Sequence, residues 1–403
     1  MPPRAYPCLG GLTRNTSFSV TIVRQHHQSG CRITDAAAME RALDLARTVR
    51  GRTYPNPAVG AVVIASDGTC VGEGATQRAG GPHAEVMALR SAGNRTRNAT
   101  LVVTLEPCNH HGSTPPCTRA SLEAGITRVI VAVRDPNPKV RGGGVEFLRS
   151  HSVEVVTGVC GQAATELAQG YFKFIKTGRP HITAKWAMTL DGRIAGPGGG
   201  GRISGSAAWS RVHAMRDEVD AIITGIGTIQ SDDSRLTVRP MPIDGHQPVR
   251  VVFDSLARID PKARVLQAGG ETLLITTEAA PPERLGRLTQ AGANILSFPQ
   301  NSLGRVDIVE VLDALGQRGL TSALLEAGPG LVGAFMSAHA IDRVVVFVAP
   351  WILGSGISAV SAATELNRHL VSSPTISPVG SDVMIIGDVC RYGPNGTEKC
   401  SPE

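Results

Sequence analysis

The chain has 403 residues, and because a typical domain holds roughly 100–200 residues, two domains are expected. Hydrophobic residues make up 42% and charged residues 18%, a globular composition that excludes disorder throughout the chain. Of the net charge of +6, residues 1–34 carry +4, because they hold four arginines and neither lysine nor acidic residues. The rest of the chain is nearly neutral, so no basic face for nucleic acid is implied.

No apolar run is long enough to cross a membrane. The longest, at 344–353, contains Pro350 and falls short of the ~18–20 residues that a bilayer requires. The acid-free tail at 1–34 has the composition of an organelle transit peptide, and the alternative is a disordered tail or an over-extended start. We expect a cytoplasmic protein, with import into an organelle left open.

The predicted first domain alternates strands and helices. Thr34 is a candidate N-cap for a helix that begins the folded chain, and Asp67-Gly68 is a hairpin-turn signal. This succession predicts a layered α/β domain over residues 35–178. Its strands are expected at 58–64, 70–74, 100–105 and 128–133, and helices at 83–92 and 118–124.

A Gly/Pro junction at 177–180 follows a predicted helix at 161–176 and marks the expected domain boundary. A second α/β domain is predicted over 179–390, and the polar end of the chain, 391–403, is expected to be loose. The strands of the second domain are expected at 181–188, 221–224, 249–253, 272–276, 323–325 and 343–348.

The most informative residues of the first domain are His83, Glu85, Cys108 and Cys117. One imidazole and two thiolates form a three-ligand zinc set with an open fourth position, which is typical of a catalytic site. Zinc in such a site makes water a nucleophile near neutral pH. Glu85 is placed to move the proton of that water to a ring nitrogen and to the leaving amine, and this pattern is a known signature of zinc deaminases in general. The motif indicates hydrolytic deamination of an aminopyrimidine-like ring.

Two histidines beside this motif are ambiguous. His110 and His111 are either substrate contacts or solvated loop residues. The spacing of the cysteines is more decisive, since eight residues separate Cys108 from Cys117, whereas deaminases of nucleic acids and free nucleosides typically carry Cys-x-x-Cys. This spacing opposes a nucleic-acid base deaminase.

The stretch 104–117, with 54–63 upstream and 134–138 downstream, closely resembles the family of bifunctional riboflavin-biosynthesis deaminase–reductases. The resemblance implies a cytidine-deaminase-like three-layer domain that deaminates a diaminopyrimidinone ribosyl phosphate. It also implies a dihydrofolate-reductase-like α/β domain that then reduces the ribosyl group to ribityl with NADPH. In the first domain it implies zinc on His83, Cys108 and Cys117, Glu85 as the proton shuttle and Asn56 in the substrate pocket.

The second domain has no Rossmann fingerprint, because Gln230 stands where the third glycine would follow Gly225-Ile226-Gly227. A Gly-rich turn at 326–331 offers backbone N–H groups that suit a pyrophosphate, although such turns are often only connections. Segments 185–195, 225–228, 232–239 and 251–255 are similar to successive motifs of the family's reductase domain.

This similarity implies two groups of reductase site residues. The NADPH contacts would be Ala187, Thr228, Asp232, Ser255, Gly328, Pro329, Gly330, Leu331, Val332, Gly333 and Ala334. The phosphoribosyl substrate would contact Arg216, Leu236, Arg239 and Glu326. Guanidinium groups suit a phosphate because they offer several charge-assisted donors. Opening of the ribose requires a proton at its ring oxygen, which Lys185 or an acid can supply.

The chain departs from the family pattern at Thr76, Ser113, Arg202, Ser234 and Ala327. These positions often hold His, a basic residue, Trp, Pro and Gly. One alternative is therefore an active deaminase joined to an inactive reductase, and another is a zinc-stabilised binding module without catalysis. We expect a small-molecule phosphoribosyl pyrimidine as the binding partner, and neither nucleic acid nor a membrane. A homodimer is expected only because such α/β enzymes often form dimers.

Overall fold

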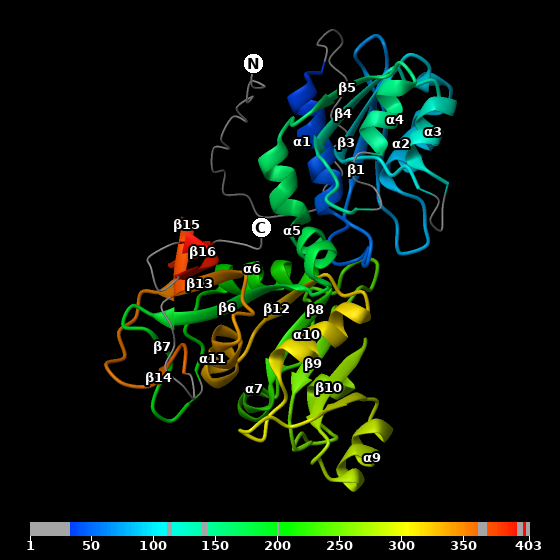
Figure 1. The fold of residues 1–403 in the computed structure, drawn as a ribbon. Coiled ribbons are helices and arrows are strands. Elements are labelled where there is room, and N and C mark those ends of the chain that lie inside the picture. The colour runs from blue at the N-terminus through cyan, green and yellow to red at the C-terminus, as the bar shows by residue number, and fades with distance from the viewer. Residues whose placement is uncertain are drawn as a thin grey trace. The chain divides into compact units, whose positions relative to one another are not determined.

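The computed structural model describes residues 33–110, 115–138, 143–199, 201–361, 369–392 and 398–399. The chain forms two compact units, one of residues 33–49 and 56–172, the other of Arg50–Pro55 and the chain from Lys173 onward (Figure 1). The division falls within α5 (Gly161–Thr177), and the sequence did not place Arg50–Pro55 with the second unit. No helix in the described ranges is long and apolar enough to cross a membrane.

The first unit is a five-stranded sheet with helices on both faces (Figure 1), and its strand order is β2-β1-β3-β4-β5. β1 pairs antiparallel with β2 and β3, whereas β3, β4 and β5 run parallel. The elements are α1 (Asp35–Arg47), β1 (Gly60–Ile64), β2 (Cys70–Ala75), α2 (Ala84–Ala92), η1 (Gly93–Thr96), β3 (Thr100–Leu105), α3 (Cys117–Glu123), β4 (Arg128–Val133), α4 (Gly144–Ser150), β5 (Glu154–Thr157) and α5.

Local signals explain how this unit begins. The Thr34 side chain accepts a hydrogen bond from Ala37 N and caps α1, and Asp67 accepts from Thr69 in the turn between β1 and β2. A Cβ on Gly60 would lie 1.9 Å from the Ala42 carbonyl of α1, so the strand and the helix backbone are in direct contact. Gly72 and Gly74 of β2 also lie against α2, since added Cβ atoms there would lie 2.3 and 2.4 Å from the Ala88 backbone. The close approach of helices to both faces confirms the expected three-layer arrangement.

The second unit is built on a larger sheet, with the order β11-β10-β9-β8-β12-β6-β13-β16-β15. Neighbouring strands run parallel from β11 to β13, and β16 and β15 are antiparallel. The first elements are β6 (His181–Thr189), β7 (Arg193–Ala195), α6 (Ser206–Asp217), β8 (Ala221–Gly225), α7 (Ile226–Asp232), β9 (Val249–Phe253), α8 (Arg264–Gln267), β10 (Thr272–Thr277), α9 (Pro282–Gln290) and β11 (Asn294–Phe298). The remaining elements are α10 (Ile308–Gln317), β12 (Ser322–Leu325), α11 (Pro329–Ser337), β13 (Arg343–Ala349), β14 (Ile357–Ser358), β15 (His369–Val379), β16 (Asp382–Tyr392) and β17 (Glu398–Lys399).

Two parts of this unit differ from the sequence-based expectation. The structure contains β11 and the β15–β16 hairpin, which were not expected from the sequence. Both consist mainly of exposed or half-buried residues. The backbone at Arg391–Tyr392 continues β16, and Glu398–Lys399 pair with it as β17, so this part of the C-terminal end is not loose. The expected tail at 1–32 lies outside the described residues.

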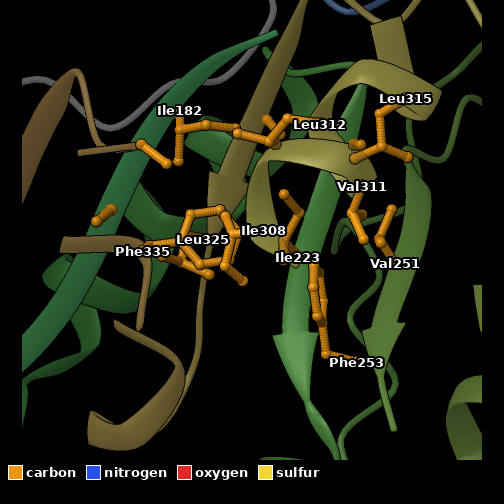
Figure 2. Close-up of a cluster of buried hydrophobic side chains, with 14 of the residues drawn as sticks. Ile182, Ile223, Val251, Phe253, Ile308, Val311, Leu312, Leu315, Leu325 and Phe335 are labelled. Carbon is orange, nitrogen blue, oxygen red and sulfur yellow. The ribbon is translucent and has the colours of Figure 1, made fainter. Parts of the chain in front are cut away.

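Apolar side chains hold α10 and α11 against one face of the sheet (Figure 2). Leu312 and Leu315 of α10 belong to one buried cluster with Ile182 of β6 and Leu325 of β12. Phe335 of α11 is also fully buried, and burial of each such side chain stabilises the fold by about 1.5–3 kcal/mol. A second cluster, with residues of α6, covers the opposite face. Because β6, β8, β9 and β12 run parallel, the segments that follow them emerge at the same edge.

Candidate active sites

Three potential metal ligands converge in the first unit. His83 is the N-cap residue of α2, Cys108 follows β3, and Cys117 is the first residue of α3. Their ligand atoms all lie within 4.8 Å of one another. His83 Nδ1 is 3.6 Å from Cys108 Sγ and 3.3 Å from Cys117 Sγ. Two ligands held by one tetrahedral zinc ion lie roughly 3.5–3.8 Å apart, so this donor set fits zinc.

Glu85 lies in the first turn of α2, two residues after the candidate ligand His83, and is buried. Burial raises the pKa of Glu85 to about 7. A carboxyl group with such a pKa can both accept and donate a proton near neutral pH. Hydrogen bonding from Cys117, and then from His83, lowers the pKa of Cys108 and favours its thiolate, the form that binds metal.

A second buried carboxylate fixes the loop that carries Cys108. Glu106 accepts hydrogen bonds from Arg134 Nε at 2.7 Å and from the backbone N–H groups of Gly144 and Val145 at 3.2 and 3.0 Å. These bonds join the end of β3 to the start of α4. The sequence motif contained Glu106, but nothing in the pattern indicated this anchoring role.

In the described part of the chain, the other site residues expected in this unit lie outside the zinc-ligand cluster. Asn56 is half-buried in the segment before β1, and His110 is exposed. Thr76 is buried and its hydroxyl accepts from Val59 N at 3.2 Å, so it stabilises the local backbone. His111 and Ser113 lie outside the described residues.

The second unit brings three charged side chains together from distant parts of the sequence. Glu326, directly after β12, accepts from Arg216 Nε at 2.6 Å and from Arg216 Nη2 at 3.0 Å. Lys185 Nζ, on β6, lies 3.7 Å from the same carboxylate. Arg216, on α6, also donates to the Thr237 carbonyl at 3.0 Å. Arg216 and Glu326, two of the four expected substrate contacts, are therefore directly paired, and Lys185, the expected proton donor, lies beside them.

The charges of this cluster are mutually stabilised. Burial by itself raises the pKa of Glu326, but the positive charges of Arg216 and Lys185 outweigh burial and lower this pKa to about 2. Burial lowers the pKa of Lys185, and the charge of Glu326 opposes that shift. Glu326 is therefore an anion at neutral pH and holds the two cations in place.

The loop after α7 carries the other two expected substrate contacts. Leu236 is buried, and Arg239 is exposed while its backbone N–H donates to His213 Nδ1 of α6 at 3.1 Å. Burial and then the positive charges of Arg216, Arg235 and Arg264 lower the pKa of Arg239. Such a concentration of guanidinium groups favours binding of an anion.

The expected NADPH contacts surround the carboxyl edge of the parallel strands. Ala187 lies on β6, Thr228 and Asp232 on α7, and Ser255 follows β9. Gly328 caps α11, and a Cβ there would lie 3.9 Å from Thr228 Oγ1, so these two segments adjoin. The Gly328–Ala334 stretch holds the N-cap and the first turns of α11. Pro329 has no N–H and Val332 N donates to the Gly328 carbonyl, so the N–H groups of the first turn that suit a phosphate are those of Gly328, Gly330 and Leu331. Asp232 lies exposed at the last position of α7.

The departures in the reductase motifs cause no visible disruption. Ala327 is not among the described residues with positive φ, so its Cβ is tolerated in this turn. The Arg202 guanidinium lies over the ring of Trp209, 4.8 Å from the centroid. Ser234 lies half-buried after Asp233, which has a φ of 41°.

Two family descriptions match this chain. Residues 180–381 match the RibD C-terminal domain, and residues 32–133 match the cytidine and deoxycytidylate deaminase zinc-binding region. The chain is 41% identical to riboflavin biosynthesis protein RibD of Aquifex aeolicus over 80% of this chain and 89% of that protein. It is 38% identical to RibD of Escherichia coli over 87% of this chain and 98% of that protein.

Solved structures agree with these matches over both units. Acinetobacter baumannii RibD, form 2, has a TM-score of 0.77 and 35% identity, covering 88% of this chain and 98% of that chain. A diaminohydroxyphosphoribosylaminopyrimidine deaminase/5-amino-6-(5-phosphoribosylamino)uracil reductase of Thermotoga maritima has a TM-score of 0.75 and 33% identity, covering 88% and 99%.

Proposed function

The chain belongs to the RibD family of riboflavin biosynthesis proteins, and from that premise we propose which of its residues carry out the two reactions. It is a bifunctional enzyme, with a zinc-dependent deaminase domain followed by an NADPH-dependent reductase domain. The observation that carries the assignment of residues is the convergence of His83, Cys108 and Cys117 beside the buried carboxyl group of Glu85.

In the deaminase reaction, His83, Cys108 and Cys117 hold zinc, which supplies Lewis acidity that makes water a nucleophile near neutral pH. Glu85 takes one proton from the attacking water and delivers it to a ring nitrogen. It then moves the second proton, from the hydroxyl group added to the ring carbon, to the amine, which leaves as ammonia as the C–N bond breaks. Its pKa of about 7 supports both transfers. Asn56 orients the pyrimidine, and Glu106 keeps the Cys108 loop in position.

In the reductase reaction, NADPH supplies the hydride that adds to C1′ of the ribosyl group. Lys185 gives a proton to the ring oxygen as the C1′–O bond breaks, and that oxygen becomes a hydroxyl of the ribityl chain. Glu326 keeps Lys185 and Arg216 oriented. Arg216 and Arg239 bind the 5′-phosphate, and Leu236 packs against the substrate.

The cofactor is held by the segments at the carboxyl edge of the sheet. The start of α11, within Gly328–Ala334, would hold a phosphate of NADPH through the backbone N–H groups of its first turn, and Thr228 lies beside it. Added Cβ atoms at Gly227 and Gly330 would meet nothing within 4 Å, which leaves room for a ligand. Ala187, Asp232 and Ser255 complete the proposed cofactor contacts.

The substrate is a small phosphoribosyl pyrimidine, and we propose 2,5-diamino-6-ribosylamino-4(3H)-pyrimidinone 5′-phosphate. The homodimer, the cytoplasmic location and the domain boundaries at 35–178 and 179–390 stay predictions.

The test is to incubate zinc-loaded protein with the diaminopyrimidinone ribosyl phosphate and NADPH, following ammonia and NADPH absorbance in the same tube. We expect ammonia first and NADPH oxidation after it. Ammonia without NADPH oxidation would contradict the reductase assignment, and the absence of both would contradict the whole proposal.

A further inference from the structure

A short segment from the amino-terminal half of the sequence is part of the reductase unit. Arg50–Pro55 lies between α1 and β1 in the sequence, and both of these elements belong to the first unit. Gly51 has a φ of 70°, and an added Cβ would lie 2.8 Å from the Val219 carbonyl and 2.9 Å from the Asp217 carbonyl. The segment is therefore closely packed against the chain that follows α6.

Arg52 uses its whole guanidinium group in this segment. Its Nη2 donates to Asp217 Oδ1 at 2.8 Å, and its Nε donates to Asp244 Oδ2 at 2.9 Å. Its Nη1 donates to the carbonyls of Arg50 and Asp217 at 3.0 and 3.1 Å. The side chain is only 16% exposed. Because an arginine fork has fixed geometry, these bonds set the separation of the two carboxylates.

The two carboxylates belong to the elements that carry the proposed phosphate-binding arginines. Asp217 is the last residue of α6 and directly follows Arg216. Asp244 lies in the loop that follows Arg239.

A hydrogen bond joins the two ends of the loop that holds Arg239 and Asp244. Gln247 Oε1 accepts from Val238 N at 2.8 Å, so the loop closes upon itself between these two residues. The Arg239 backbone N–H also donates to His213 of α6. A displacement of Asp244 relative to Asp217 would therefore change the separation of the Arg216 and Arg239 side chains.

We propose that Arg52 is a positioning residue of the reductase, which fixes the distance between Arg216 and Arg239 and so tunes binding of the 5′-phosphate. The inference rests on the proposed roles of those two arginines. Arg52 does not touch the substrate, and its effect is exerted on phosphate binding rather than on hydride transfer.

The experiment measures KM and kcat of the full-length reductase for the deaminated phosphoribosyl substrate and for NADPH. Loss of a group that binds the ground state and the transition state equally raises KM and leaves kcat unchanged. We expect Arg52→Ala to raise the substrate KM roughly tenfold, with kcat and the NADPH KM within about twofold of wild type. Arg52→Lys should give an intermediate substrate KM, because an ammonium group cannot reproduce the separate bonds that Nη2 and Nε donate to Asp217 and Asp244.

Two further variants separate positioning from general stability. Asp244→Asn should raise the substrate KM as well, and in the Arg52→Ala background it should add little, since both changes break the same contact. Arg179→Ala is the matched control, because Arg179 pairs with Asp313 of α10 in the same unit and contacts neither phosphate-arginine element. Its substrate KM should be that of wild type.

The outcomes are distinguishable. If Arg239→Ala raises the substrate KM and Arg52→Ala, Arg52→Lys and Asp244→Asn do not, the role of Arg52 is wrong and the proposed function stands. If Arg239→Ala itself leaves KM unchanged, the proposed phosphate site is wrong. If Arg52→Ala does not fold, Arg52→Lys and Asp244→Asn decide the matter by the same measurement.

Discussion

Glu85 is buried, the Glu326 side chain is only 10% exposed, and each lies close to a proposed reaction centre in its own unit. Their pKa values shift in opposite directions. Burial raises the pKa of Glu85 to about 7. Around Glu326 the charges of Arg216 and Lys185 outweigh burial and lower the pKa to about 2. Burial alone therefore does not decide the charge of a carboxyl group, and the neighbouring cations do.

The opposite pKa shifts of Glu85 and Glu326 suit two different chemical roles. Glu85 can exchange a proton near neutral pH, which suits the transfer of protons between water and an amine. Glu326 remains charged and acts through the side chains that it orients, Lys185 and Arg216. In the proposed mechanism, the same residue type is thus a proton carrier in the deaminase and a fixed counter-ion in the reductase.

The largest effect is expected from the zinc ligands. Cys117→Ser should release zinc and abolish ammonia formation, while reduction of the deaminated substrate continues. Cys160→Ser is the matched control, because Cys160 is a buried cysteine of the same unit outside the ligand cluster. Zinc content and the two activities are the measurements, and loss of zinc from both variants alike would contradict the assigned ligand set.

Glu326→Gln should destabilise the second unit by about 3–5 kcal/mol, because removal of one partner leaves buried cations without their counter-charge. All three tryptophans, Trp186, Trp209 and Trp351, lie in this unit, so urea unfolding followed by tryptophan fluorescence reports it selectively. Glu271→Gln, a partly exposed partner of Arg318, is the control. Equal destabilisation by the two changes would mean that the cluster has no special role.

The pH dependence of stability should sharpen the contrast. The pKa of Glu326 lies near 2 in the folded chain and near 4.5 when unfolded, so its stabilisation is complete above about pH 4.5 and is lost as the pH falls towards 2. The loss is on the order of 3 kcal/mol. The free energy of unfolding of wild type should therefore decline more steeply than that of Glu326→Gln between these pH values, and parallel curves would refute the lowered pKa.

The smallest effect is expected at a half-exposed ion pair of the same unit. Arg318 Nη2 lies 2.6 Å from Glu271, with side chains 41% and 33% exposed. Such pairs contribute about 0–1 kcal/mol because water and salt screen them. Arg318→Ala should therefore change the tryptophan-monitored unfolding free energy by less than about 1 kcal/mol, and a loss as large as that of Glu326→Gln would overturn the ranking.

The deaminase site could be predicted from the sequence because its residues lie in two short motifs, around His83 and from Cys108 to Cys117. The reductase cluster could not be derived in this way, since Lys185 and Glu326 come from strands far apart in sequence, and only the family resemblance joined them. Arg52 carried no signal at all, because its proposed role depends on the inclusion of Arg50–Pro55 in the second unit.

The strands that were missed have a similar physical explanation. β15 is half-buried or exposed along its whole length, so it shows no apolar run of the kind that marks a buried strand. β11 is an edge strand with the same character.

The most direct test of two separate reaction centres is to assay both reactions in Glu85→Gln. With the diaminopyrimidinone substrate, we expect ammonia release to fall by about 10²–10⁴-fold while zinc remains bound. With the deaminated substrate and NADPH, the same protein should reduce the ribosyl group at the wild-type rate. Loss of both reactions in a folded, zinc-containing protein would contradict the account.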